Sequence, residues 1–261
     1  MKRLSFLILG FWLVMAILAP WLGIKPDAIH LEQILAVPGG DTLLGQDDLG
    51  RDILSRLIAG AHVSLLVATT VTLVTFCVGT LLGLLAGYVG GWLDRLLMQI
   101  TDVFMAFPGI LLAISFAAVL GPGLSNLILA LCLTSWVGYA RLTRAQALAL
   151  SQRQHVLAAV SMGASMPRIL FRHMLPLLLA PLLVEATFSF ASLIIAEASL
   201  SFLGLGIQPP HASWGSMLRD ATRYLLVAPH YVLAVGLSLM SLVLSVNMLG
   251  DALRDRLDVK R

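Results

Sequence analysis

Three acidic residues interrupt long apolar segments of this sequence: Asp102, Glu185 and Glu197. An ionisable side chain inside hydrocarbon is costly and usually faces protein or water, so each acid could line a pathway, relay protons or accept structural hydrogen bonds. We expect Asp102 at the depth of the lipid headgroups, because it lies near the start of its segment. For Glu197 we expect a structural role. The alternative is a more specific function, as a site that binds a proton or the substrate.

Other patterns that carry chemistry are missing from the sequence. It contains no phosphate-binding lysine loop, no nucleophile elbow and no paired metal-ligand motif, and its 6 histidines are dispersed. Its 2 cysteines fall within apolar runs, where packing is expected. We therefore expect no catalytic residue, no metal ligand and no cofactor in this chain. Active transport would then draw its energy from an ion gradient or from another chain.

The composition places these acids in a membrane protein. Hydrophobic residues make up 59% of the sequence and charged residues 12%, about half the charged fraction typical of soluble domains. A helix of ~20 apolar residues crosses the ~30 Å hydrocarbon core of a bilayer. Segments of this length lie at 4–24, 63–88, 96–120, 124–145, 177–202 and 227–249. The sequence predicts an all-α polytopic membrane protein with six transmembrane helices.

The distribution of Lys and Arg predicts the orientation of these helices. An even number of spans puts both termini on one side, and that side then carries most of the lysines and arginines. Such a bias marks the cytoplasmic face. We therefore expect a multi-pass membrane protein with both termini in the cytoplasm. The same bias accounts for the net charge of +3 without a nucleic-acid partner.

Residues 25–62 are expected to form an outer loop. Asp47 or Asp48 could cap a helix that begins near residue 49. The apolar stripe of that helix would consist of Ile53, Leu57 and Ile58. We expect the helix to lie in the membrane interface before the second span turns inward. This divides the chain into residues 1–62, with the first span and the interfacial helix, and a core domain of five spans at 63–261.

Two further features concern the packing of the spans. A ridge of glycines at every fourth position of the second span would let another helix approach closely. It consists of Gly79, Gly83 and Gly87. Pro108 lies within the third span and should kink it or open a cavity beside it.

The longest inner segment, residues 146–176, points to a docking partner. Every charged residue between Arg141 and Arg172 is an arginine, and a run of small residues is followed by Gly163 as a helix stop. A membrane protein gains little from so long an excursion unless something docks there. We predict a short helix that couples the chain to an ATP-hydrolysing partner. The residues expected to carry this coupling are His155, Val156, Leu157, Ala158, Ala159, Met162, Gly163, Ala164 and Arg168.

Five stretches spread over the chain resemble a known family. They are LGQDDLGRDILSRLIAGAHVSLL (44–66), GLLAGYVGGWLDRLLMQITDVFMAFP (83–108), YARLTRAQALAL (139–150), AEASLSFLGLGIQPPHASWGSML (196–218) and NMLGDALRDRLD (247–258). The sequence is similar to the inner-membrane permease subunits of bacterial ABC importers for dipeptides, oligopeptides and nickel, and specifically to the second of the two permeases. Within the docking segment, the resemblance to that family's coupling loop rests on Ala158, Ala159, Gly163, Leu175 and Pro176, while Leu157 replaces the family's acidic residue and His173 its isoleucine.

The resemblance implies a type I ABC importer permease architecture. A second, homologous permease would complete a heterodimer, two ATPase subunits would bind ATP and Mg, and an extracytoplasmic binding protein would deliver the substrate. Nickel, a metal chelate, dipeptides and oligopeptides all remain open as substrates. The alternative is a proton-coupled secondary transporter that uses its intramembrane Asp and Glu residues.

Overall fold

A computed structural model describes residues 2–40 and 42–258 of the chain. The basic residues 260 and 261, which contribute to the predicted orientation, lie outside this part. Within it the protein is helical and forms no β-strand. The elements are α1 (Lys2–Leu18), η1 (Ala19–Trp21), η2 (Leu31–Gln33), α2 (Ile53–Val89), α3 (Gly91–Met105), α4 (Gly109–Leu120), α5 (Leu124–Ser151), α6 (Gln154–Ser161), α7 (Met166–Arg168), the π-helix η3 (Ile169–Met174), α8 (Leu175–Phe202), α9 (Trp214–Thr222) and α10 (Pro229–Asp258).

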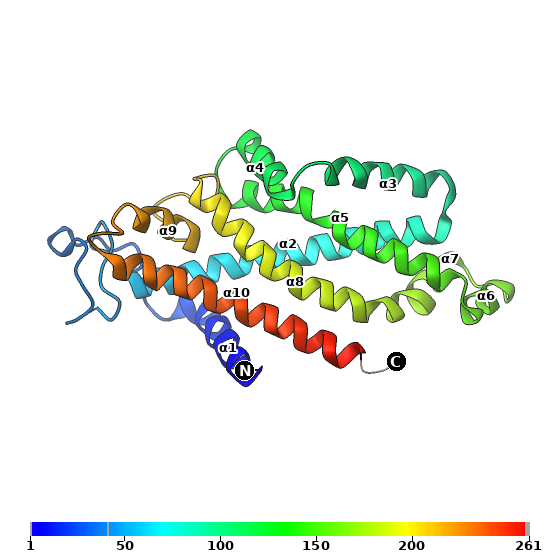
Figure 1. Cartoon of the computed structure of the whole chain (residues 1–261), viewed down its shortest axis with the longest axis horizontal. Helices are drawn as coiled ribbons and strands as arrows, with labels where there is room; N and C mark the ends of the chain where they lie inside the picture. Colours follow the sequence, from blue (N-terminus) through cyan, green and yellow to red (C-terminus); the bar gives the residue numbers. More distant parts are fainter. Residues whose placement is uncertain (1, 41, 259–261) are drawn as a thin grey trace.

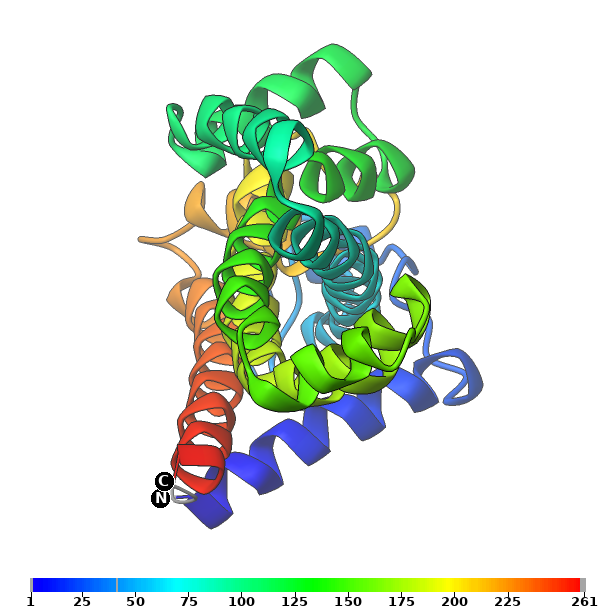
Figure 2. The ribbon, with the colours of Figure 1, turned by 90° about the vertical axis from the view of Figure 1, so that its right-hand side faces the viewer.

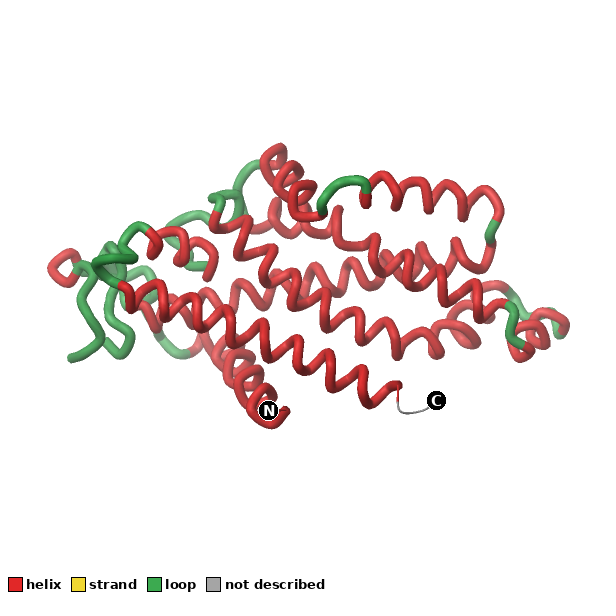
Figure 3. The backbone as a smooth tube through the Cα atoms, in the orientation of Figure 1, coloured by secondary structure: helices red, strands yellow, loops and turns green. Residues whose placement is uncertain are grey.

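The long helices run along one axis and give the molecule two distinct ends (Figure 1). Helices α2, α5, α8 and α10 form the body, and α1 crosses α10 on one side. One end consists of α6, α7 and the neighbouring ends of α5 and α8. The opposite end consists of the loop between α1 and α2 together with α9, and it holds most of the irregular backbone (Figure 3). We call these the α6 end and the α9 end.

Among the described residues, three helices are long and apolar enough to cross a membrane, namely Ile53–Val89, Met166–Phe202 and Pro229–Leu257. A fourth span results if α3 and α4 are counted as one broken span. The first apolar helix is shorter, at Ser5–Trp21, and α5 contains Arg141 and Arg144 in its second half. The all-α membrane fold is confirmed, while the count of six spans stays a prediction.

The prediction of a separate interfacial helix before the second span is wrong. Its residues form the first turns of α2, which runs without a break for 37 residues, and its expected stripe of Ile53, Leu57 and Ile58 is buried. The cap is Asp52, whose carboxylate accepts from the Ser55 amide at 2.8 Å. A helix of this length is about 55 Å long, so its first turns can project beyond a ~30 Å core.

The third predicted span is broken rather than kinked. Helix α3 ends at Met105, α4 begins at Gly109 and the two helices meet at 88°. Pro108 occupies the N-cap of α4. Because proline lacks an amide hydrogen and its ring clashes with the preceding turn, it is tolerated where a helix starts but not in its middle.

The glycine ridge of α2 packs against α5. A Cβ atom at Gly79 or Gly83 would lie 2.4 Å from the Trp136 carbonyl oxygen or 2.2 Å from the Ala140 carbonyl oxygen. Only a residue without a side chain allows the two backbones to approach this closely. The ridge therefore serves packing within the chain.

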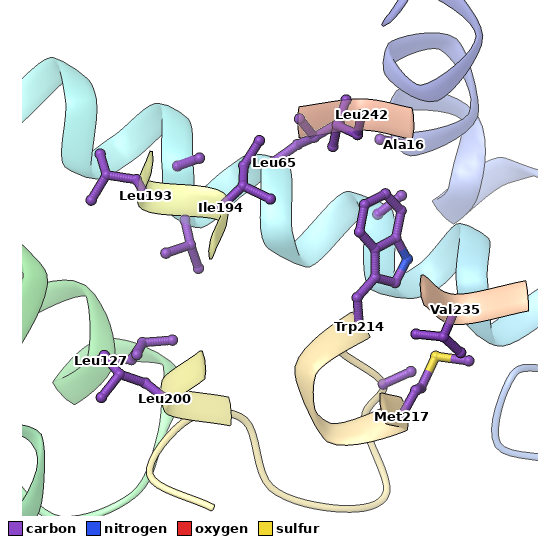
Figure 4. Packing of buried hydrophobic residues seen from close by; sticks show 14 of the residues in the cluster. Ala16, Leu65, Leu127, Leu193, Ile194, Leu200, Trp214, Met217, Val235 and Leu242 are labelled. Atoms are coloured by element: carbon purple, nitrogen blue, oxygen red, sulfur yellow. The ribbon is translucent and has the colours of Figure 1, made fainter. Parts of the chain in front are cut away.

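The larger hydrophobic core lies around Trp214, at the start of α9 (Figure 4). This side chain is fully buried, its Nε1 donates to the Leu57 carbonyl oxygen at 2.9 Å, and its ring meets that of Trp12 edge to face. A Cβ at Gly60 would lie 2.8 Å from the indole. Trp214 thereby fixes the position of α9 against α1 and α2.

Candidate functional site

The predicted coupling residues lie at the α6 end of the molecule. Helix α6 packs against the end of α5 and against η3, and this segment lies at the front when the molecule is viewed from this end (Figure 2). The structure therefore forms the short helix that the small-residue run predicts, and it forms it where the chain reverses direction.

Two of the coupling residues face inward and hold α6 on the bundle. The side chains of Val156 and Ala159 are 1% and 2% exposed. Val156 belongs to the second hydrophobic cluster, which includes Leu150 of α5 as well as Ile169 and Leu170 of η3. Since an α-helix repeats every 3.6 residues, positions 156 and 159 lie on the same face. That face is unavailable to a partner.

The other coupling residues face outward. His155, Leu157, Ala158 and Met162 are exposed, and so is Arg168 on α7. Leu157 is 48% and Met162 81% exposed. The nine predicted coupling residues therefore differ in exposure, and their role in coupling stays a prediction. Five side chains and Gly163 are available at the surface, Val156 and Ala159 are anchors, and Ala164 is half-buried.

Gly163 ends α6 with a pair of crossed hydrogen bonds. Its φ is +75°, its amide donates to the Val160 carbonyl oxygen at 2.9 Å, and the Ala164 amide donates to the Ala159 carbonyl oxygen at 3.0 Å. This is the Schellman arrangement, which satisfies carbonyl groups at a helix end and requires a left-handed residue. The predicted helix stop is confirmed, and its φ explains why a glycine stands there.

Asp102 is exposed and pairs with an arginine of the neighbouring helix. Its Oδ1 lies 3.0 Å from Nη1 of Arg141, and both side chains are largely exposed. About two helical turns farther from the α4 bend, Asp94 accepts two hydrogen bonds from Arg144, one of them at 2.7 Å. These two pairs join α3 to α5. The role that the structure gives Asp102 is a link between helices.

Glu197 is fully buried and holds three elements together. Its carboxylate accepts from the Ser64 hydroxyl of α2 at 2.7 Å and from the Ser201 hydroxyl of α8 at 2.8 Å. The Ser213 side chain at the start of α9 also lies near this carboxylate, and its hydroxyl donates to Oγ of Ser216 at 3.2 Å. A buried carboxylate is tolerated when its oxygens are satisfied in this way. This is the arrangement that a structural role predicts.

Glu185 differs from both, because it lines a groove. Two adjoining cavities of about 500 and 210 Å³ share Ser135, Ser192 and Ala196. Their walls come from α4, α5 and α8, and we call them the α5–α8 groove. Glu185 is half-buried within it, and its nearest hydrogen-bond donor is the Ser189 hydroxyl at 3.4 Å from Oε1. Of the three acids, it is the one that lines these cavities.

The polar side chains of the groove follow one face of α8 and the facing turn of α5. They are Thr134, Ser135, Glu185, Ser189, Ser192 and Ser199. Polar groups in a membrane protein avoid lipid because hydrocarbon offers them no partner. This face of the bundle must therefore meet water or another protein.

An ion network at the α9 end has no counterpart among the predicted sites. Both Asp47 and Arg56 are buried, and Oδ2 of Asp47 lies 2.7 Å from Nε of Arg51 and 3.3 Å from Nε of Arg56. Arg56 also reaches Asp27 at 3.2 Å. The alternation of acidic and basic residues in 47–56 is the signal that could have revealed this network. In the described ranges, no group of three His, Cys, Asp or Glu side chains could hold a metal ion.

Comparisons with known proteins agree with this architecture. A family model described as "Binding-protein-dependent transport system inner membrane component" matches residues 79–259. A dipeptide transport system permease protein of Alkalihalophilus pseudofirmus is 41% identical over 255 residues, covering 97% of this chain and 84% of that protein. A glutathione transport system permease protein of Pectobacterium atrosepticum is 46% identical over 223 residues, or 85% and 74% of the two chains.

A solved structure shows the same fold. It is an inward-facing conformation of the MetNI methionine ABC transporter, with a TM-score of 0.62 and 22% sequence identity over 78% of this chain and 97% of that chain. The region that the family model matches, residues 79–259, contains α6 and the helices that flank the α5–α8 groove. This chain belongs to the family of binding-protein-dependent transport system inner membrane components, and it is a multi-pass permease subunit of that family.

Proposed function

We propose that this chain forms half of the translocation pathway of an ATP-driven importer of dipeptides or oligopeptides, and that α6 couples it to the ATPase. The observation that carries the coupling role is the division of α6 into two faces. Val156 and Ala159 fix the helix to the bundle, whereas Leu157, Ala158 and Met162 stay exposed. A helix anchored on one face can transmit a push applied to the other.

Two ATPase subunits supply the energy, and they bind the ATP and Mg. The α6 end then faces the cytoplasm, together with both chain termini. The exposed arginines of this end, Arg153, Arg168 and Arg172, support this orientation because cytoplasmic segments of membrane proteins are rich in Lys and Arg. The family's acidic coupling position is Leu157 in this chain, so the contact with the ATPase is apolar at that point.

A second, homologous permease covers the α5–α8 groove and completes a heterodimer. The polar face described above supports this assignment, because it must be shielded from lipid. An extracytoplasmic binding protein docks on the α9 end, on the opposite side of the membrane from the ATPases. Its contact surface is drawn from the loops at 25–52 and 203–228.

Peptides are favoured over nickel as the substrate. The relatives that this chain resembles are named for dipeptides and glutathione. A proton-coupled mechanism is disfavoured by the placement of the three acids, because Asp102 pairs with Arg141, Glu197 is enclosed by serines and Glu185 faces the groove. In the part of the chain that the structure describes, no hydrogen bond joins one of these acids to another.

Uptake of a radiolabelled dipeptide tests the proposal. It needs cells with the complete transporter, with this chain present or deleted, and separate arms for nickel and for nickel with free histidine. We expect dipeptide uptake that requires this chain, continues when a protonophore collapses the proton gradient and stops when ATP is depleted. Uptake of nickel alone would reassign the substrate. Uptake that stops with the proton gradient while ATP is kept constant would contradict the ATP-driven mechanism.

A further inference from the structure

Glu185 presents an unpaired negative charge near the middle of a membrane-spanning helix. It is the eleventh residue of the 28-residue α8, and it is the single charged side chain among the described residues that line the α5–α8 groove. No arginine, lysine or histidine of the described chain lies within ion-pair distance of it. A carboxylate at this depth needs a cation or water.

The surroundings leave room for a cationic group beside Glu185. Oε1 of Glu185 lies 3.6 Å from the position that a Cβ atom would take at Gly138 of α5, which is ordinary van der Waals contact. The absence of a side chain at Gly138 therefore keeps the facing helix clear of the carboxylate. The Ser135, Ser189 and Ser192 hydroxyls, which line the same cavity, add hydrogen-bond acceptors around this space.

A second polar group near Glu185 also lacks a partner. The Tyr139 side chain is 1% exposed, and its hydroxyl makes no hydrogen bond of good geometry to the described residues. Ser189 and Glu185 are close enough to act on it electrostatically. Buried hydroxyls are nearly always satisfied in folded proteins. Tyr139 does not line the groove, but its unsatisfied hydroxyl adds a second polar group to the region around Glu185.

We infer that Glu185 receives the α-ammonium group of a peptide in transit, with the neighbouring serine hydroxyls as further acceptors. This inference rests on the proposed function and names the chemical group by which the pathway recognises its substrate. A primary ammonium has three donors and no acceptor, so one carboxylate and several hydroxyl oxygens suit it. A divalent metal ion takes a larger set of carboxylate, imidazole or thiolate ligands, which the groove does not provide.

The test is the binding of alanyl-alanine and of N-acetyl-alanyl-alanine to the complete transporter in lipid nanodiscs. The binding protein is left out, so that only the membrane subunits can discriminate, and saturation-transfer NMR detects weak binding. We expect the free dipeptide to bind about ten- to a hundredfold more tightly than the acetylated one, as for a hydrogen bond to a charged group. Glu185→Gln should remove this preference and Glu185→Asp should keep it. Ser199→Ala, at the far end of the groove, is the matched control and should also keep it.

Equal binding of the two dipeptides to the wild-type transporter, or no binding of either, would overturn the inference. So would an unchanged preference in Glu185→Gln. If Glu185→Gln does not assemble, the wild-type comparison still decides. These results do not test the proposed function itself. The proposed function would be contradicted only if the wild-type transporter imported no peptide.

Discussion

The α9 end of the molecule satisfies its charges internally, whereas the α6 end leaves them exposed. At the α9 end, Asp47 and Arg56 are buried in an ion network, and the Trp214 indole is hydrogen-bonded inside the core. At the α6 end, Arg153 and Arg168 are exposed and form no ion pair within the described residues.

This difference indicates that the buried charges of the α9 end stabilise the fold, whereas the exposed charges of the α6 end serve function. A buried ion pair costs desolvation and is tolerated when its geometry is good, so the α9 network holds its loop in one conformation. Exposed arginines and apolar side chains add little to the stability of the isolated chain. The α9 end is therefore held in one conformation by its own contacts, whereas the α6 end leaves its charged and apolar side chains free for a partner.

The largest effect is expected at the α9 end, from Asp47→Ala. The Asp47 carboxylate accepts from Nε of Arg51 at 2.7 Å and from the Leu49 and Arg51 amides at 2.9 Å. Its removal leaves the buried arginines with weaker counter-charges only, Asp48 at 3.4 Å from Arg51 and Asp27 at 3.2 Å from Arg56. We expect a loss of about 3–5 kcal/mol in the free energy of unfolding, measured by denaturation of the purified chain in detergent.

Asp48→Ala is the matched control for this change. The side chain of Asp48 is 20% exposed and reaches Arg51 only at 3.4 Å. Burial, together with the neighbouring charges of Asp47 and Asp220, raises the pKa of Asp48, so its charged form gains little from folding. We expect a loss below about 1 kcal/mol. Equal losses for the two variants would contradict the network.

A smaller effect on stability is expected at the α6 end, from Gly163→Leu. No other atom lies within 4 Å of the position that a Cβ would take at Gly163, so the cost comes from its φ of +75° alone. A left-handed leucine costs roughly 1–2 kcal/mol, and Gly163→Asn costs less because asparagine tolerates this region. We expect the leucine variant to lower peptide uptake per ATP in proteoliposomes and the asparagine variant to retain it. Equal uptake by both would show that the helix stop has no part in coupling.

The sequence predicts the helical segments well where hydrophobicity decides them. The docking helix, its glycine stop and the packing ridge on α2 follow from small residues at helical spacing, and the structure has all three. A change of helix direction at Pro108 is also predicted, but the sequence does not predict that the helix breaks there. Local sequence cannot show how far α3 and α4 diverge, because their packing against α5 sets the angle.

The remaining errors concern long-range contacts. Ile53 and Leu57 form an apolar stripe that suits either a membrane surface or a protein core. The Trp214 side chain, more than 150 positions away in the sequence, packs on this part of α2, and the stripe is therefore buried in the protein core. Similarly, 3.6-residue spacing places Val156 and Ala159 on one face of α6, but only the position of η3 shows that this face is buried.

The adjacent residues Ala158 and Ala159 allow the most direct test of the central claim, that the outer face of α6 couples ATP hydrolysis to transport. Ala158 is exposed, and Ala159 is 2% exposed. Ala159→Arg, which the coupling pattern alone would suggest as an uncoupling change, instead disrupts the packing of α6 on the bundle. Ala158→Arg adds the same charge and bulk on the outer face only.

The measurement is the number of dipeptides imported per ATP hydrolysed by the reconstituted transporter, with Ala158→Ser as the control. We predict that Ala158→Arg leaves the thermal stability of the chain unchanged and lowers this ratio about tenfold, whereas Ala158→Ser keeps it. An unchanged ratio in a stable Ala158→Arg transporter would contradict the account.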